Sequence, residues 1–230
     1  RPLESFESRH FGYFARPERF HSRDALLTQF EENLRLLRRD RVDTLQLHEA
    51  DFHHWWSPDA SYAGRIRADI DYAFDEAPAL ATLRELKREG RCRFIGISGN
   101  TADHMKRILE AVKVDTLLVA FNYDLIRRGA RGVLPVAKAK GCVRLVGAIF
   151  QRGLARPQPD LLTDPPAWMT ADLVDRYRRV YALQKQSGMS LAEMGVRYVA
   201  AQPEVDTIII GAKTPEEIEE CVRAEEKGPL

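Results

Sequence analysis

A short stretch near the carboxyl end of the chain combines residue types suited to binding an anion. Gly211, Ala212, Lys213 and Thr214 follow the β-branched run of residues 207–210 (TIII) and precede a segment with helical signals. Free N–H groups at a helix start bind anions, a glycine lets the backbone approach a ligand closely, and a lysine adds positive charge. The pattern predicts a binding site for a phosphate group.

A second kind of chemistry is indicated by His48, which ends the apolar run of residues 43–48 (DTLQLH). At the carboxyl end of a strand, a neutral imidazole can orient a polar group of a ligand and stabilise charge that develops on it. The alternative is a histidine that only makes hydrogen bonds within a loop. Ser98 and Asn100 lie at the end of the next apolar run, residues 94–98 (FIGIS). Polar groups therefore follow two neighbouring runs.

These candidates are separated by a regular alternation of apolar runs and amphipathic segments. Residues 116–121 (TLLVAF) and 143–148 (VRLVGA) are two further runs, and near-continuous apolar strands are typical of parallel sheets buried on both faces. The alternation predicts the α/β class with a parallel sheet. Helices are predicted over residues 22–39, 78–89, 101–112, 132–140, 190–201 and 214–223.

Capping residues mark the starts of the last two predicted helices. Ser190 and Glu193 have the spacing of a capping box. Thr214, Pro215 and Glu217 combine that spacing with proline at the first helical position. The segment that carries the predicted phosphate site therefore leads directly into a well-defined helix start.

Two long segments, residues 51–77 and 151–181, follow predicted strands, where TIM barrels build their active sites. The first contains the sequence HHWW at residues 53–56. Adjacent histidines do not have the spacing of metal ligands, so no metal site is expected. We expect this segment to line a substrate entrance, with the tryptophans half buried.

Composition excludes several classes of partner. The chain has 230 residues, of which 44% are hydrophobic and 30% are charged, and its formal net charge is +1. This composition suits a globular domain with no electrostatic attraction to nucleic acid or an anionic membrane, and no apolar run is long enough to cross a bilayer. Cys92, Cys142 and Cys221 are far apart and odd in number. We therefore expect neither a disulfide framework nor a zinc site. We expect the protein to work in a reducing compartment, the cytoplasm.

Four stretches, in this order and spacing, resemble the aldo-keto reductase family. They are RVDTLQLHEAD (residues 41–51), KREGRCRFIGISGN (87–100), RGL (152–154) and TIIIGAKTPEEIEE (207–220). The resemblance implies a (β/α)8 TIM barrel formed by a single domain over residues 1–230. About five strands are visible, so the barrel is expected to be incomplete at its N-terminus.

The resemblance further implies an NAD(P)-dependent oxidoreductase that interconverts an aldehyde or ketone and an alcohol by hydride transfer with nicotinamide. His48 corresponds to a member of a catalytic tetrad whose tyrosine, lysine and aspartate lie before the long helix of residues 22–39. Tyr13 precedes that helix, but its surroundings (HFGYFARPERF) do not resemble those of the family's tyrosine. Turnover is therefore expected of the complete parent protein rather than of this chain alone.

The same resemblance implies that NADP or NAD is the cofactor. Ser98 and Asn100 correspond to a pair that hydrogen-bonds the nicotinamide carboxamide, with Gly99 inserted between them here. The alternative for Asn100 is that it begins a turn. A glutamine of the family corresponds to Val119, and Asn122 lies just beyond as a candidate substitute.

The pyrophosphate is expected to lie under a loop. Gln151, Arg152, Gly153 and Leu154 match the family segment that folds over it, although Arg152 is alternatively a solvated loop charge. Residues 211–214 would then hold the phosphate on the adenosine side. A tyrosine that stacks on the nicotinamide in the family is replaced here, and Phe150 is the candidate apolar substitute.

Glu217 bears on the choice between NAD and NADP. A carboxylate would repel the 2′-phosphate of NADP or accept a ribose hydroxyl of NAD, which favours a relaxed or NAD preference. The alternative is that Glu217 closes the capping box on Thr214. Glu220 matches a glutamate that contacts adenine, and Cys221 replaces the family's neighbouring asparagine.

Two other functions remain open at this stage. One is a non-catalytic nicotinamide-binding or regulatory subunit on the same fold, because fold alone does not establish function. The other is an unrelated barrel enzyme with a phosphate-bearing ligand. The expected partner is a small-molecule carbonyl or alcohol, with no nucleic acid and no membrane, and the long loops would determine its identity.

Overall fold

The fold belongs to the α/β class that the sequence predicts. The computed structural model describes residues 18–59, 62, 64–151 and 153–230. Its five strands are parallel, and their order in the sheet follows their order in the sequence. The strands are β1 (Val42–Leu47), β2 (Cys92–Gly99), β3 (Thr116–Ala120), β4 (Val143–Gly147) and β5 (Thr207–Ile209).

By their contacts, the described residues group into two compact units. The first unit extends to Gly99 and includes His104–Leu117. The second unit comprises Asn100–Asp103 and Leu118–Leu230. Each unit contains its own pair of parallel strands, so each can be described by itself. The expected single domain over residues 1–230 stays a prediction.

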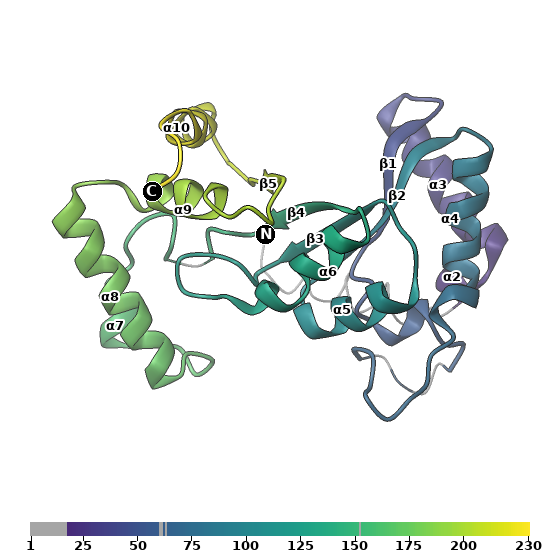
Figure 1. Cartoon of the computed structure of the whole chain (residues 1–230), viewed down its shortest axis with the longest axis horizontal. Coiled ribbons are helices and arrows are strands. Elements are labelled where there is room, and N and C mark those ends of the chain that lie inside the picture. The colour runs from purple at the N-terminus through teal and green to yellow at the C-terminus, as the bar shows by residue number, and fades with distance from the viewer. Residues whose placement is uncertain (1–17, 60–61, 63, 152) are drawn as a thin grey trace. The chain divides into compact units, whose positions relative to one another are not determined.

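In the first unit, helices pack against the strand pair β1 and β2. The register places Val42 opposite Cys92 and Leu47 opposite Ile97. Helix α4 contacts both β2 and α3 (Figure 1). The α-helices of this unit are α2 (Glu18–His21), α3 (Arg23–Leu37), α4 (Pro78–Arg88) and α5 (Ala102–Ala111), the last of which begins in the second unit.

Helix α3 forms where residues 22–39 predict it. The Ser22 hydroxyl caps its start by accepting the N–H of Ala25 at 3.3 Å. Leu26, Phe30 and Leu34 recur at helical spacing and are buried on one face. Arg38 ends the helix in the left-handed conformation, with φ of 53°. The capping residues therefore set where the helix begins and ends, and its apolar face packs it against the rest of the first unit.

The segment after β1 differs from the expectation for residues 51–77. It contains the short 3-10 helices η1 (His53–Trp55) and η2 (Phe74–Glu76). The expectation of half-buried tryptophans is wrong, because Trp55 and Trp56 are 5% and 7% exposed. Their indole N–H groups donate to the backbone carbonyls of His48 and Ala50, at 2.9 and 2.5 Å, which removes the penalty for burying them.

In the second unit, β4 pairs with β5, with Leu145 opposite Thr207 and Gly147 opposite Ile209. Helix α9 contacts both β5 and α10 (Figure 1). A separate apolar cluster around the fully buried Tyr177 packs α8 against the loop that follows β4. The helices of this unit are η3 (Gly129–Gly132), α6 (Leu134–Ala139), α7 (Asp160–Thr163), α8 (Ala171–Ser187), α9 (Leu191–Ala200) and α10 (Pro215–Glu226).

Two predicted elements have different limits in the structure. The helix expected over residues 132–140 begins later, because a 3-10 turn precedes α6 and Pro135 suits its first turn. Helix α10 continues to Glu226, beyond the predicted end at Arg223. The alternation of strands and helices is confirmed. The predicted elements deviate mainly at their ends, and α2 and α7 lie outside every predicted helix.

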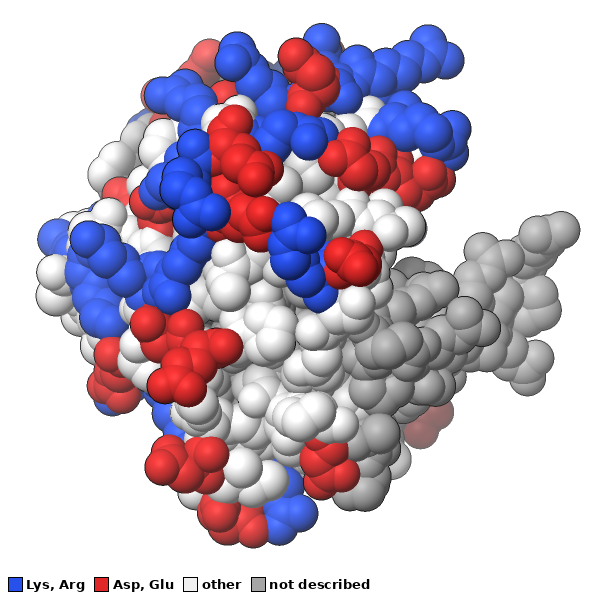
Figure 2. Space-filling view, turned by 90° about the vertical axis from the view of Figure 1, so that its right-hand side faces the viewer, with Lys and Arg blue, Asp and Glu red and all other residues white. Residues whose placement is uncertain are grey.

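Charge on the surface is mixed rather than segregated. Figure 2 shows basic and acidic side chains interspersed on one face, with an uncharged area between them. Several of these charges form ion pairs, such as Arg91 with Glu31 at 2.8 Å and Lys87 with Asp115 at 2.6 Å. Within the described part of the chain, no helix has the length and hydropathy needed to span a membrane.

A first prediction concerns the buried imidazoles of the first unit. Burial, and then the neighbouring His53, lowers the pKa of His54 below its ordinary value of 6.5, and burial also lowers the pKa of His21. The folded state thus favours the neutral imidazoles. As the pH falls below about 6.5, the unfolded chain takes up protons that the folded chain does not, so the free energy of unfolding decreases. We expect His54→Phe, which keeps a ring stacked on Phe20, to lose less unfolding free energy than wild type between about pH 7 and pH 5.5.

Urea denaturation at the two pH values measures this difference. Equal losses in wild type and His54→Phe would show that protonation of His54 is not coupled to folding.

Candidate functional site

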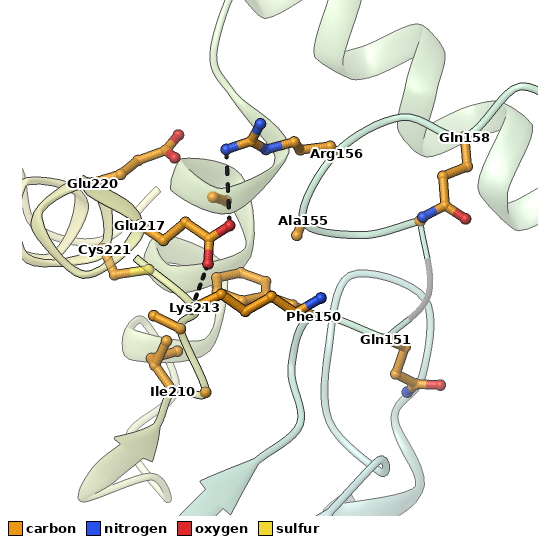
Figure 3. Close-up of a pocket in the computed structure, with 14 residues that line it drawn as sticks. Phe150, Gln151, Ala155, Arg156, Gln158, Ile210, Lys213, Glu217, Glu220 and Cys221 are labelled. Atoms are coloured by element: carbon orange, nitrogen blue, oxygen red, sulfur yellow. Dashed lines mark hydrogen bonds and ion pairs between the residues drawn. The ribbon is translucent and has the colours of Figure 1, made fainter. Parts of the chain in front are cut away.

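A cavity of about 310 Å³ lies within the second unit, at the carboxyl ends of β4 and β5 (Figure 3). Three segments line it: the loop after β4, the start of α9, and the stretch from the end of β5 through the first two turns of α10. The lining residues are Phe150, Gln151, Gly153, Ala155, Arg156, Gln158, Ala192, Ile210, Gly211, Ala212, Lys213, Glu217, Glu220 and Cys221. Seven of them were predicted from sequence to bind the cofactor: Gln151, Gly153, Gly211, Ala212, Lys213, Glu217 and Glu220.

The start of α10 supplies the electrostatic character of this cavity. The Thr214 hydroxyl accepts the N–H of Glu217 at 3.3 Å, and Pro215 occupies the first turn, as the sequence predicts. The Glu216 carboxyl accepts a hydrogen bond from the backbone N–H of the same residue and another from the Thr214 hydroxyl. The first and then the second of these bonds lower the pKa of Glu216. A helix start that stabilises a carboxylate in this way is suited to stabilising a phosphate.

Glu217 extends into the cavity rather than closing the predicted capping box. Its Oε2 accepts the backbone N–H of Lys213 at 2.8 Å, one residue before the cap. Its Oε1 lies 3.9 Å from Nη2 of Arg156, on the opposite loop (Figure 3). The Glu217 side chain is 35% exposed and that of Arg156 is 77% exposed, so the pair is screened by solvent. A ligand at this position would meet a carboxylate.

Glu220 and Phe150 define two further edges of the cavity. The Ser190 hydroxyl donates to Oε1 of Glu220 at 2.6 Å, which ties α10 to the cap of α9. The ring of Phe150 packs close to Gly195 of α9, where an added Cβ would lie 3.0 Å from its Cε1. Phe150 therefore supplies an apolar wall. Burial raises the pKa of the Cys221 thiol, which favours its neutral form.

The start of the loop after β4 is held by hydrogen bonds between Gln151 and the segment that follows β3. The amide of Gln151 donates to the Phe121 carbonyl at 3.2 Å and to the Asp124 carboxylate. Asp124 is 1% exposed and accepts two backbone N–H groups, those of Ile126 and Arg127, each at 2.8 Å. Burial raises the pKa of the Asp124 carboxyl, and these hydrogen bonds oppose the shift.

The other predicted residues of this loop have different positions. Gly153 lines the cavity and has a φ of +83°. The side chain of Leu154 is fully buried in the apolar cluster around Tyr177, so only its backbone faces the loop. Arg152 lies outside the described residues. The sequence reasoning missed Arg156 and Gln158, whose only signal was their place within the Pro-rich loop.

The remaining predicted residues near the first apolar runs have defined surroundings. His48 is exposed and directly follows β1, and its carbonyl accepts the Trp55 indole N–H. Ser98 is buried and donates its hydroxyl to the Leu47 carbonyl at 3.1 Å. The Ser98 carbonyl accepts the N–H of Ala50 at 2.7 Å. Ser98 thus fixes the turn that carries His48.

Asn100 belongs to the second unit and begins the connection into α5. Its carbonyl accepts the side-chain amide of Asn122 at 2.6 Å, and that amide also donates to the Ala120 carbonyl at 2.6 Å. Val119, in the position of the family's glutamine, is fully buried. Within the described ranges, no group of three or more His, Cys, Asp or Glu side chains is arranged to hold a metal ion.

Comparison with known proteins gives a consistent result. A model of the aldo/keto reductase family matches residues 15–230. The chain is 28% identical over 210 residues to L-galactose dehydrogenase of Arabidopsis thaliana, a match that covers 88% of this chain. It is 24% identical over 210 residues to pyridoxal 4-dehydrogenase of Microbacterium luteolum, again over 88% of this chain. The chain spans 58% and 57% of the length of these two relatives.

A solved structure with a similar fold is an aldo-keto reductase from Bacillus halodurans in its holo form. The two superpose with a TM-score of 0.66 at 24% identity, and the match covers 91% of this chain and 61% of that one. Likeness at this identity is evidence about the fold alone. The predicted fold, an incomplete α/β barrel, is confirmed by the five parallel strands and these neighbours.

A second prediction concerns Gly153, whose positive φ disfavours any other residue. An added Cβ would lie 2.7 Å from Cδ1 of Leu161 and 2.7 Å from the Tyr181 hydroxyl. We expect Gly153→Ala to lower the free energy of unfolding by about 2 kcal/mol, through backbone strain and overpacking. Gly211→Ala is the matched control, because an added Cβ there meets no atom within 4 Å, and we expect a change within about 0.5 kcal/mol.

Urea denaturation of both variants measures the difference. Equal stability of Gly153→Ala and wild type would show that the loop after β4 relaxes without cost.

Proposed function

Because the chain belongs to the aldo/keto reductase family, we propose that the cavity beside α10 binds the adenosine half of a nicotinamide dinucleotide. We propose further that the complete protein interconverts an aldehyde or ketone and an alcohol. Bound nicotinamide supplies or accepts the hydride. The substrate is a small molecule, and the residues described below bind and orient the reactants.

The proposal rests chiefly on one observation: a cavity of about 310 Å³ opens onto the start of α10. Ligand sites commonly begin at about 300 Å³. The cavity presents Gly211, Ala212 and Lys213 at a helix start that stabilises negative charge. Gln151 and Gly153 lie on the opposite side, in the loop that would cover the pyrophosphate.

Glu217 supports a preference for NAD over NADP. Its carboxylate lies in the cavity lining and already accepts the N–H of Lys213. A ribose 2′-hydroxyl can donate a hydrogen bond to this carboxylate, whereas a 2′-phosphate would be repelled by it. Arg156 is a positive side chain 3.9 Å from the Glu217 carboxylate, but it is so exposed that solvent screens its attraction for a 2′-phosphate.

Residues at the carboxyl ends of β1 and β2 suit the nicotinamide end. Ser98 uses its hydroxyl proton on the Leu47 carbonyl, which leaves the oxygen lone pairs to accept an N–H of the carboxamide. His48 follows β1 and is exposed, with its backbone fixed by Trp55. We assign His48 the role of orienting the substrate's carbonyl oxygen and Asn100 that of a second carboxamide contact.

A third prediction tests nucleotide binding and its selectivity by calorimetric titration with NADH and, separately, NADPH. We expect saturable binding of both, with NADH tighter. Glu217→Gln should raise the affinity for NADPH by about tenfold, because it removes a like charge, and change that for NADH by less than about threefold.

Glu219→Gln is the matched control, because it makes the same charge change on the same helix at an exposed residue outside the cavity lining. Failure of both nucleotides to bind wild type would contradict the proposed site. An equal gain in Glu219→Gln would show that Glu217 acts only through net charge.

A further inference from the structure

The loop after β4 contains a hydrogen-bonded closure that the sequence reasoning did not anticipate. The hydroxyl of Tyr181, on α8, donates to the Gly153 carbonyl at 3.0 Å. The same oxygen accepts the backbone N–H of Gln158 at 3.1 Å. One hydroxyl thus joins the two ends of loop 153–158, which carries Arg156 at its centre.

Tyr181 acts from outside the cavity. It is 7% exposed and does not belong to the cavity lining, whereas both of its hydrogen-bond partners, Gly153 and Gln158, do. Its ring packs edge-on against Tyr177, with centroids 6.0 Å apart, inside the apolar cluster of α8. The ring is therefore anchored, and the hydroxyl has a fixed position from which to hold the loop.

The hydroxyl is suited to serve both partners at once. A phenol has one proton to donate and lone pairs to accept, and here the Gly153 carbonyl takes the proton while the Gln158 N–H uses a lone pair. Burial raises the pKa of Tyr181, so the hydroxyl keeps its proton at neutral pH. The hydroxyl also packs closely against Gly153, where an added Cβ would lie 2.7 Å from it.

We infer that Tyr181 is a positioning residue for dinucleotide binding, a role that rests on the proposed function of the cavity. Its hydroxyl holds loop 153–158 in the one shape that presents Gly153, Arg156 and Gln158 to the nucleotide. The entropy of ordering the loop is then lost during folding rather than during binding. A residue that only filled the core would act through its ring and not through its hydroxyl.

Tyr181→Phe separates these two roles, because it keeps the ring and removes the hydroxyl. Tyr123→Phe is the matched control, since it removes a buried hydroxyl that donates to Oε1 of Gln202 at 2.7 Å, away from the loop. Two quantities are measured on the full chain: the amide hydrogen exchange of Gln158 without nucleotide, by NMR, and the affinity for NADH, by calorimetry.

We expect Tyr181→Phe to speed exchange at Gln158 by about tenfold and to weaken NADH binding by about tenfold, while amides within α8 keep their protection. Tyr123→Phe should change neither quantity. Gln158→Pro removes the N–H donor from the loop side and leaves α8 untouched, so it should weaken NADH binding even if Tyr181→Phe fails to fold. Because the Gln158 side chain itself lines the cavity, Gln158→Ala, which keeps the N–H, is its control and should bind NADH more tightly than Gln158→Pro.

The outcomes distinguish this inference from the proposal beneath it. Unchanged NADH affinity in Tyr181→Phe, with wild type binding normally, would overturn the positioning role alone. Absence of NADH binding in wild type would overturn the proposed function and, with it, this role.

Discussion

Parallel pairing of the strands is the constraint on which the rest of this structure depends. Parallel neighbours end at the same edge of a sheet, so the segments that follow them meet there. In the second unit, Gly147 of β4 lies opposite Ile209 of β5. The loop after β4 and the turn into α10 therefore emerge together and line one cavity. In the first unit, the same register brings Ser98 to the Leu47 carbonyl, next to His48.

The chemistry of the cavity follows from the start of α10. Its first turn stabilises negative charge, and the protein partly satisfies that potential with its own Glu216 and Glu217. A phosphate group would be attracted by the same positive potential at the helix start. The carboxylate of Glu217 would repel a second phosphate, such as the 2′-phosphate of NADP, placed beside it. The proposed selectivity between dinucleotides therefore rests on the Glu217 carboxylate, which lies where the helix start already attracts anions.

Much of the fold could be predicted from the sequence because its signals are local. The β-branched runs became strands, and Ser190 and Thr214 cap helices as their spacing predicts. The candidate cavity was predicted in part, since Gln151 and residues 211–213 meet in it as expected. These residues belong to short motifs whose chemistry does not depend on distant partners.

What could not be predicted depends on side-chain contacts that no sequence motif specifies. Tyr181 reaches the loop across 28 positions, and the burial of Trp55 depends on carbonyl groups in a turn whose shape no local pattern specifies. The Glu217 carboxylate accepts the backbone N–H of Lys213, a contact outside the capping-box pattern from which its position was predicted. The roles of His48 and Ser98 toward a substrate and a nicotinamide stay predictions.

The most direct test of this account is a crystal structure of the chain grown with NADH. The account predicts a phosphate against the backbone of residues 211–214, with a ribose hydroxyl near Glu217. Density for the dinucleotide at another site, or a cavity that stays empty at saturating NADH, would contradict it.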